Sequence, residues 1–151
     1  MKHTTVCYIE KEGKYLMIHR IKKKNDANHD KWIGIGGKLE PGESPFDCIK
    51  REVFEETGLI VVPDYRGFIT FVSNEFGTEY MHLFTAKEFS GELKSDCDEG
   101  VLEWIKKEDL LSIPMWEGDR IFHKLIDDDE PFFSLKLVYE KDRLIEHRLN
   151  S

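Results

Sequence analysis

Apolar and polar residues alternate over several short stretches of the chain, which is typical of half-buried β-strands. The N-terminal region shows this pattern over Thr4–Ile9 and again over Tyr15–Ile21, with the polar turn Glu10–Lys14 between them. These two stretches predict a hairpin. A third strand is expected over Trp32–Lys38, where glycines leave room for another backbone or for a ligand.

A helix is expected over Ser44–Thr57 because its ends carry residues that typically begin and end helices. Ser44 suits the N-cap, Pro45 the first helical position and Asp47 the acidic position of a capping box. Gly58 stands where a glycine usually closes a helix.

The rest of the chain predicts further strands and one more long helix. The expected strands are Leu59–Val62 continuing into Gly67–Val72, Glu79–Phe89, Val101–Ile105, Phe132–Tyr139 and Arg143–Arg148, the last two forming a hairpin. The other expected elements are a polar connection over Gly91–Asp98, a short helical turn over Glu108–Leu111 and a helix over Trp116–Ile126. No repeat or linker divides the chain, so we expect one α+β domain over residues 1–151.

The acidic composition limits the partners of the protein. Lys and Arg total 22 and Asp and Glu total 30, which leaves a net charge of −8. Such a chain is poorly suited to nucleic-acid polymers or anionic membranes, but it can bind polyphosphates where a divalent cation neutralises the site. No segment is apolar enough to span a membrane. Three cysteines without metal-ligand spacing (Cys7, Cys48 and Cys97) indicate free thiols. We therefore expect a cytoplasmic protein, as a monomer or a homodimer.

Three carboxylates are expected on one face of the Ser44–Thr57 helix. Glu52, Glu55 and Glu56 are related as i, i+3 and i+4, and like charges at this spacing repel. Arg51 or a lysine can relieve part of the repulsion, but a group of oxygen ligands favours Mg²⁺ or Mn²⁺. From the carboxylates alone, a solvated acidic face explains the pattern equally well.

A longer motif surrounds these glutamates. Its positions are Gly37, Glu43, Arg51, Glu52, Val53, Glu55, Glu56, Gly58 and Leu59. Together they form the Nudix box without a departure, so the chain resembles the Nudix hydrolases, which are pyrophosphohydrolases of nucleoside diphosphates linked to another moiety. The resemblance implies the Nudix α/β/α sandwich with a central mixed β-sheet.

The resemblance also implies roles for the residues of the box. The three glutamates match catalytic carboxylates that bind the metal ion, and the carbonyl of Gly37 matches a further ligand. Glu43 and Arg51 match a structural pair that orients the loop and the helix. Lys38 directly follows the glycine and is a candidate for contact with a phosphate oxygen.

Further candidates lie outside the box. Members of the family often place an extra Glu in the loop before a strand that ends in an aromatic residue. Glu99 precedes Val101–Trp104, and it is either a metal ligand or general base or an ordinary loop acid. Arg20 is either a phosphate-binding residue or a surface charge at the end of a strand. The lysine-rich loop Lys22–Lys31 either steers phosphate groups or forms a solvated surface.

The flanks of the box resemble the MutT-like branch that hydrolyses oxidised purine nucleoside triphosphates. The similar segments read WIGIGGKLEPGE, IPMWEGDRIF and FFSLKLVYE. In that branch a Trp and a following Asp line the base pocket, and Trp116 and Asp119 match them. The alternative for Trp116 is a core anchor of its helix. Eukaryotic members carry an Asn and a second Asp where this chain has Ile33 and Gly118.

The resemblance therefore predicts a Mg²⁺-dependent pyrophosphohydrolase active in nucleotide pool sanitation. Its expected substrate is 8-oxo-dGTP or a related oxidised purine dNTP, cleaved to the monophosphate and pyrophosphate. Two alternatives stay open. One is a Nudix hydrolase of a sugar nucleotide or an unmodified dNTP, and the other is a non-catalytic module that senses a nucleotide.

Overall fold

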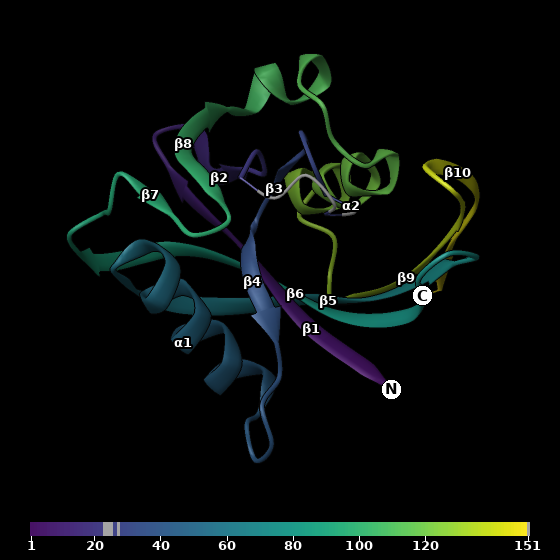
Figure 1. Ribbon diagram of the computed structural model, residues 1–151, viewed down its shortest axis with the longest axis horizontal. Helices are drawn as coiled ribbons and strands as arrows, with labels where there is room; N and C mark the ends of the chain where they lie inside the picture. Colours follow the sequence, from purple (N-terminus) through teal and green to yellow (C-terminus); the bar gives the residue numbers. More distant parts are fainter. Residues whose placement is uncertain (23–25, 27, 151) are drawn as a thin grey trace.

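The computed structural model describes residues 1–22, 26 and 28–150. The strands are β1 (Lys2–Lys11), β2 (Lys14–His19), β3 (Trp32–Ile33), β4 (Ile35–Lys38), β5 (Leu59–Ser73), β6 (Gly77–Gly91), β7 (Asp96–Cys97), β8 (Gly100–Lys106), β9 (Phe133–Glu140) and β10 (Arg143–Asn150). The helices are α1 (Pro45–Thr57), the 3-10 helix η1 (Lys107–Ser112) and α2 (Glu117–Asp127) (Figure 1).

β1 lies near the middle of a mixed sheet. It runs parallel to β6, with Lys2 opposite Glu79, and on its other side it pairs antiparallel with β4 and then with β2. The strand order is β10-β9-β5-β6-β1-β2-β8-β7, with β3 beside β2 and β4 beside β1. The pair β5–β9 is also parallel. The mixed sheet that the resemblance implies is confirmed.

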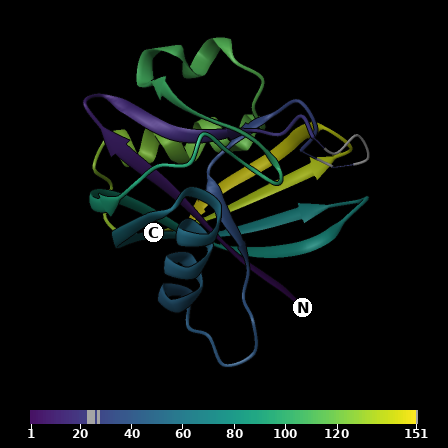
Figure 2. The ribbon, with the colours of Figure 1, turned by 60° about the vertical axis from the view of Figure 1, so that its left-hand side comes forward.

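The two α-helices cover opposite faces of this sheet, as Figures 1 and 2 show from two directions. Alternation along β1 makes both faces apolar. Cys7 and Ile9 belong to the core beneath α1, whereas Val6 and Tyr8 belong to the core that includes Phe122 of α2. The layers are therefore helix, sheet and helix. Among the described residues, no helix has the length and apolar composition needed to cross a membrane.

The expected ends of α1 are confirmed. The Ser44 hydroxyl accepts a hydrogen bond from the Asp47 backbone N–H at 3.1 Å, and the Asp47 carboxylate accepts one from the Ser44 N–H at 3.0 Å. Pro45 occupies the first turn, and Gly58 closes the helix in the left-handed region with a φ of 81°. These caps fix where α1 begins and ends relative to the glycine-containing strand before it.

The segment expected as one strand over Trp32–Lys38 is two strands with different partners. β3 pairs with β2 and β4 pairs with β1, so the chain crosses between them at Gly34. A Cβ atom at Gly34 would lie 2.6 Å from Cγ2 of Val6, which explains why a glycine occupies the crossing. The single-strand expectation was wrong because it took no account of this change of partner.

Other boundaries also differ from expectation. β2 ends at His19 because the Arg20 N–H donates to the Lys31 carbonyl at 3.0 Å, which turns the chain into the loop. The expected polar connection before β8 contains β7, which pairs Cys97 with Gly100 in a tight hairpin. β5 is continuous, as expected, and also includes residues 63–66, where two bulges keep it paired with β6.

His123 is a buried imidazole without a hydrogen bond. It is 3% exposed, and neither ring nitrogen has a hydrogen-bond partner among the described residues. The ring centroids of Tyr8 and Tyr15 lie 4.2 and 5.1 Å from that of His123. Burial lowers the pKa of His123 to about 3, and the charges of Lys107 and Arg120 add to the shift. The folded protein therefore keeps this ring neutral at pH values where the unfolded chain protonates it.

Stability is expected to contain a component that is lost as the pH falls. The unfolded imidazole titrates near 6.5. Below that pH, His123 should lower the free energy of unfolding by about 1.4 kcal/mol per pH unit. His123→Leu should remove this component, and urea unfolding of both proteins between about pH 7 and about pH 5 measures the difference in slope. Parallel profiles for the two proteins would contradict the neutral buried state.

Candidate active site

A cleft of about 300 Å³ lies where the end of α1 meets the turn between β7 and β8. Its lining residues are Lys22, Glu52, Glu55, Glu56, Lys94, Cys97, Asp98 and Glu99. The three box glutamates and the candidate Glu99 therefore surround one opening, although they come from separate parts of the chain.

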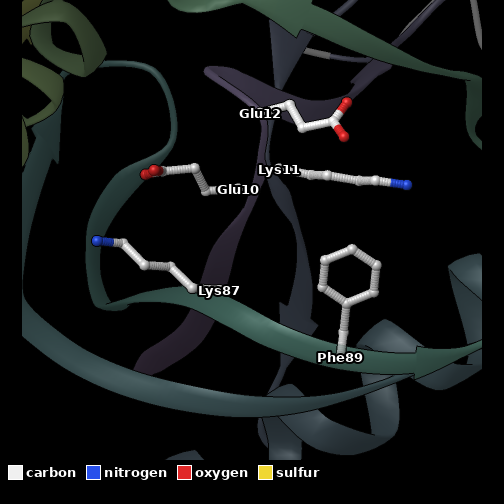
Figure 3. A pocket seen from close by; sticks show the side chains of 5 residues that line it. All are labelled: Glu10, Lys11, Glu12, Lys87 and Phe89. Atoms are coloured by element: carbon white, nitrogen blue, oxygen red, sulfur yellow. The ribbon is translucent and has the colours of Figure 1, made fainter.

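A larger hollow of about 550 Å³ lies between the β1–β2 turn and β6 (Figure 3). Its charged side chains diverge, because Glu10 and Lys87 point to one side and Lys11 and Glu12 to the other, while the Phe89 ring points from β6 toward Lys11. Glu10 is also engaged in an ion pair of 2.9 Å with a lysine of η1. No residue of the Nudix box lines this hollow, so the carboxylate-lined cleft is the better candidate.

Arg51 connects the loop before α1 to the carboxylates of the helix. Its Nε and Nη2 donate to the two carboxylate oxygens of Glu43 at 2.7 and 2.9 Å, and Nη2 also donates to the Lys38 carbonyl at 3.2 Å. Nη1 donates to Glu52 at 2.8 Å and to Glu55 at 3.3 Å. The hydrogen bonds from Arg51 lower the pKa of Glu43 to about 2. The expected pair of Glu43 and Arg51 is present, and Arg51 also relieves part of the repulsion on the helix.

Gly37 lies on β4, against the side chain of Glu52. It is opposite Thr5 of β1, whose hydroxyl donates to the Gly37 carbonyl at 3.3 Å. A Cβ atom at this position would come within 2.5 Å of the carboxyl carbon of Glu52. Only a glycine therefore allows Glu52 to rest against the strand, next to the carbonyl that the motif assigns to the metal ion.

Glu56 carries a buried carboxylate oxygen that lacks a donor. Its Oε2 atom has no hydrogen-bond partner among the described residues. Burial and then the neighbouring Glu99 and Glu52 raise the pKa of Glu56 well above its ordinary value, although Arg20 opposes the shift. Burial also raises the pKa of Glu52, against the effect of Arg51. This end of the cleft therefore holds more acidic groups than it has donors to satisfy.

The oxygen ligands of the cleft suit a divalent cation, but their side chains are not arranged as a preformed metal site. Within the described ranges, no three His, Cys, Asp or Glu side chains converge closely enough to hold an ion. Arg51 instead binds two of the box glutamates. The unpaired oxygen of Glu56, its repulsion with Glu99 and the adjacent Gly37 carbonyl are features that a hard cation would satisfy.

Glu99 reaches the cleft from the two-residue turn between β7 and β8. Gly100 lets this turn pack against β2, because a Cβ atom there would collide with the His19 carbonyl. Arg20 follows the end of β2 and donates to Glu99 at 3.1 Å and to Asp26 at 2.8 Å. Both of these Arg20 partners are carboxylates, so Arg20 holds Glu99 at the cleft.

The candidate lysines differ in their positions. Lys38 is exposed on β4 and does not line the cleft. Lys22 does line it, and its ammonium donates to the Cys97 carbonyl at 2.7 Å, while the next two lysines of that loop fall outside the described residues. Sequence reasoning missed Lys94, which lines the cleft and donates to the Glu55 carbonyl at 2.7 Å. Its position depends on a contact with the end of α1 that no local pattern indicates.

Trp116 and Asp119 lie at the start of α2, on the other face of the sheet. The indole N–H of Trp116 donates to the side-chain carbonyl of Asn28 at 2.6 Å, and the Lys31 ammonium lies 4.4 Å from the indole centroid. Trp116 also belongs to the core, so it anchors its helix as well. Asp119 is 7% exposed, and burial followed by the charge of Glu79 raises the pKa of its carboxyl to about 7.

The two departures from the eukaryotic pattern have structural explanations. The Gly118 N–H donates to the Tyr139 hydroxyl at 2.7 Å, and a Cβ atom at Gly118 would lie 2.6 Å from Cδ1 of Leu137. A second aspartate would therefore displace the packing beneath α2. Ile33 packs against both cores, and its side chain has no group that can hydrogen-bond to a base.

The segment of β3 and β4 connects the two groups of residues. The Trp32 N–H donates to the Pro114 carbonyl, two residues before Trp116, at 2.8 Å, and Gly37 lies against Glu52. Figure 1 shows this segment running from the side of α2 toward α1. Trp116, whose core Trp32 packs against, and the carboxylate cleft thus adjoin the two ends of one short stretch of backbone.

Comparison with known proteins identifies the class of this protein. The NUDIX domain profile matches residues 1–126, and the chain therefore belongs to the Nudix family. It is a hydrolase that acts on phosphoric anhydrides. Nudix hydrolases generally use divalent metal cations.

Individual relatives refine this assignment. The oxidized purine nucleoside triphosphate hydrolase of Danio rerio is 31% identical over 132 residues, which cover 85% of this chain and 83% of the relative. The CTP pyrophosphohydrolase of Escherichia coli is 29% identical over 122 residues, which cover 79% and 86%. The crystal structure of the mutator MutT protein from Bacillus halodurans matches with a TM-score of 0.87 at 30% identity and covers 99% of this chain and 98% of its own. The chain is a MutT-like Nudix hydrolase.

Proposed function

We propose that the chain acts as a single domain over residues 1–151 and hydrolyses an oxidised purine dNTP, above all 8-oxo-dGTP, in the presence of Mg²⁺. The products are the monophosphate and pyrophosphate, so one water is added and the α–β phosphoanhydride bond breaks. The observation that carries the substrate assignment is the pair of Trp116 and Asp119. An indole that can stack on a purine and a buried acid lie together at the start of α2.

The cleft beside α1 supplies the groups for the phosphate chemistry. Those that would hold the cation are Glu52, Glu55, Glu56, Glu99 and the carbonyl of Gly37. A bound Mg²⁺, or Mn²⁺ with its similar preference for oxygen, would neutralise phosphate oxygens and activate a water. A carboxylate of the same set accepts the proton of that water, and Glu99 is our candidate. Arg51 and Glu43 hold the loop against α1.

The basic side chains near the cleft have separate roles in this proposal. Lys22 and Lys94 line it and offer positive charge to the phosphate tail. Lys38 remains a candidate for a phosphate contact beside Gly37. Arg20 acts by holding Glu99, since its guanidinium is bound to carboxylates.

The cellular setting in this proposal is the cytoplasm. All three cysteines are free thiols, which suits a reducing compartment. The partner is a nucleotide, with no nucleic-acid polymer and no membrane, and the protein works as a monomer or a homodimer.

Hydrolysis of an unmodified nucleotide is the second candidate. It is favoured by the likeness to the E. coli CTP pyrophosphohydrolase and by Ile33, which offers no hydrogen bond to a purine. A sugar nucleotide is the other substrate that this second candidate includes. A non-catalytic sensor has less support, because nucleotide binding alone does not require the full set of box glutamates.

A substrate panel tests the proposal. Pyrophosphate or phosphate release is measured with Mg²⁺ for 8-oxo-dGTP, the ordinary dNTPs, CTP, ADP-ribose and a sugar nucleotide. We expect the highest kcat/KM for 8-oxo-dGTP. Asp119→Ala should lower that value about tenfold or more, because the base loses a hydrogen-bonding partner in a buried site. Asp142→Ala, in the exposed β9–β10 turn, serves as the control and should match the wild type.

Each other result of the panel has a definite meaning. Preference for CTP or an ordinary dNTP would replace the proposed substrate and keep the carboxylate cleft. Unchanged turnover of 8-oxo-dGTP by Asp119→Ala would remove this residue from the base site. No turnover of any compound would favour the sensor.

A further inference from the structure

Glu79 is a carboxylate on the same face of the sheet as Asp119. It lies on β6, opposite Phe71 of β5 and Lys2 of β1. Phe71 in turn contacts Trp116 edge-on, with ring centroids 5.8 Å apart. These cross-strand neighbours bring Glu79 to the area around the start of α2, although it was not a candidate from sequence.

Hydrogen bonds hold the Glu79 side chain in place. The Thr4 hydroxyl donates to its Oε2 at 2.6 Å, and the Lys2 ammonium lies 3.3 Å from its Oε1. Thr4 and Glu79 both belong to the strands that form this face of the sheet, and Thr4 is buried. The carboxylate is therefore fixed while part of it remains exposed, with 27% of its side-chain surface accessible.

Asp119 is the nearby acid without a side-chain partner among the described residues. Its carboxyl makes no hydrogen bond or ion pair with any described residue, although only 7% of the residue is exposed. The charge of Glu79 is close enough to raise the pKa of Asp119, in addition to burial, while Arg120 and Lys31 oppose the shift. Burial and the charge of Glu79 therefore both favour the protonated form of the Asp119 carboxyl.

We propose that Glu79 is a second base-reading carboxyl, which acts together with Asp119 to bind the hydrogen-bonding edge of a guanine-type base. A guanine edge presents the N1–H and amino donors beside the O6 acceptor. An ionised carboxylate accepts from the two donors, and a protonated carboxyl donates to O6. Oxidation at C8 leaves this edge unchanged, so 8-oxoguanine is read in the same way.

This pair also accounts for the two positions where the chain departs from the eukaryotic pattern. Ile33 cannot hydrogen-bond to a base, and Gly118 leaves no room for a second aspartate on α2. Glu79 supplies a second carboxyl from β6 instead. The proposal rests on the proposed function for the presence of a base beside Trp116, but it assigns a residue that the Nudix box does not include.

The test compares Glu79→Gln with two controls. Glu88→Gln changes an exposed acid on the same strand, and Lys2→Met removes the ion pair but keeps the Glu79 carboxylate. Values of kcat and KM are measured for 8-oxo-dGTP, dGTP and CTP. Dissociation constants for 8-oxo-dGMP and CMP are measured without added metal, so that the result does not depend on turnover. Thermal unfolding shows whether each variant is folded.

We expect Glu79→Gln to weaken the binding of guanine nucleotides, raising their KM and Kd about tenfold or more. The same constants for the cytosine nucleotides should change less than about twofold. Both controls should keep the wild-type ratio of guanine to cytosine binding. An unchanged ratio in Glu79→Gln would overturn the proposal. An equal shift in Lys2→Met would also overturn it, because the effect would then come from the position of the N-terminal strand.

The same data separate this proposal from the proposed function. The proposed function is judged by which nucleotide the wild-type protein hydrolyses best. The role of Glu79 is judged by whether its variant changes the ratio between the two bases. A wild-type preference for CTP with an altered ratio in Glu79→Gln would support the base contact and reject the oxidised purine as substrate. No binding of either monophosphate would overturn the role of Glu79.

Discussion

Replacing Glu56 by Gln is expected to remove most of the turnover while making the metal-free protein more stable. In the wild type, the Glu56 Oε2 atom is buried without a donor and faces the charge of Glu99. The raised pKa means that Glu56 takes up a proton when the metal-free protein folds, whereas a glutamine amide can donate to Glu99 without that proton, so the free energy of unfolding should rise by about 1–3 kcal/mol. The same change removes an anionic oxygen from the set proposed to hold the cation, so kcat should fall at least about 100-fold.

Activity and stability are measured on the same preparations. The kcat for the best substrate of the panel is determined over a range of Mg²⁺, and urea unfolding is followed in the presence of a chelator. Glu103→Gln, which changes an exposed acid on β8, should match the wild type in both measurements. Full activity of Glu56→Gln would refute the metal assignment. Lower metal-free stability of the Glu56→Gln variant would show that the folded protein satisfies the Glu56 carboxylate better than its contacts indicate.

The parts of the site that depend on neighbouring residues could be predicted from the sequence. The caps of α1 lie within a few positions of each other, and the helix repeat places the three box glutamates on one face. Arg51 and Glu43 are also close in sequence, and their pair is present. Local spacing carries this information because both partners belong to one loop and one helix.

The parts that depend on distant strands could not be predicted. Arg20 and Glu99 are 79 positions apart, which is too far for a local sequence motif to connect them. Their contact exists because β2 pairs with β8. Glu79 meets the start of α2 only through the register of β5, β6 and β1. The alternating pattern predicts strands but not their partners, and for the same reason the division of Trp32–Lys38 into two strands was missed.

Arg51→Lys is expected to damage stability and activity together. The guanidinium of Arg51 donates to both oxygens of Glu43, to Glu52, to Glu55 and to the Lys38 carbonyl. A lysine ammonium keeps the charge but cannot make the two parallel bonds to one carboxylate. The loop before α1 should loosen, and Tm should fall by about 5 °C or more. Because Glu52 also loses its donor, kcat/KM should fall about 10- to 100-fold.

Glu43→Gln distinguishes the structural part of this effect from the catalytic part. If Arg51 acts only by holding the loop, Glu43→Gln should lower Tm and kcat/KM in the same proportion as Arg51→Lys. If Arg51 also orients Glu52, the arginine variant should lose more activity for an equal loss of Tm. Arg143→Lys, on the exposed strand β10, is the matched control and should leave both quantities unchanged. A fully active and stable Arg51→Lys protein would show that positive charge alone is sufficient at this position.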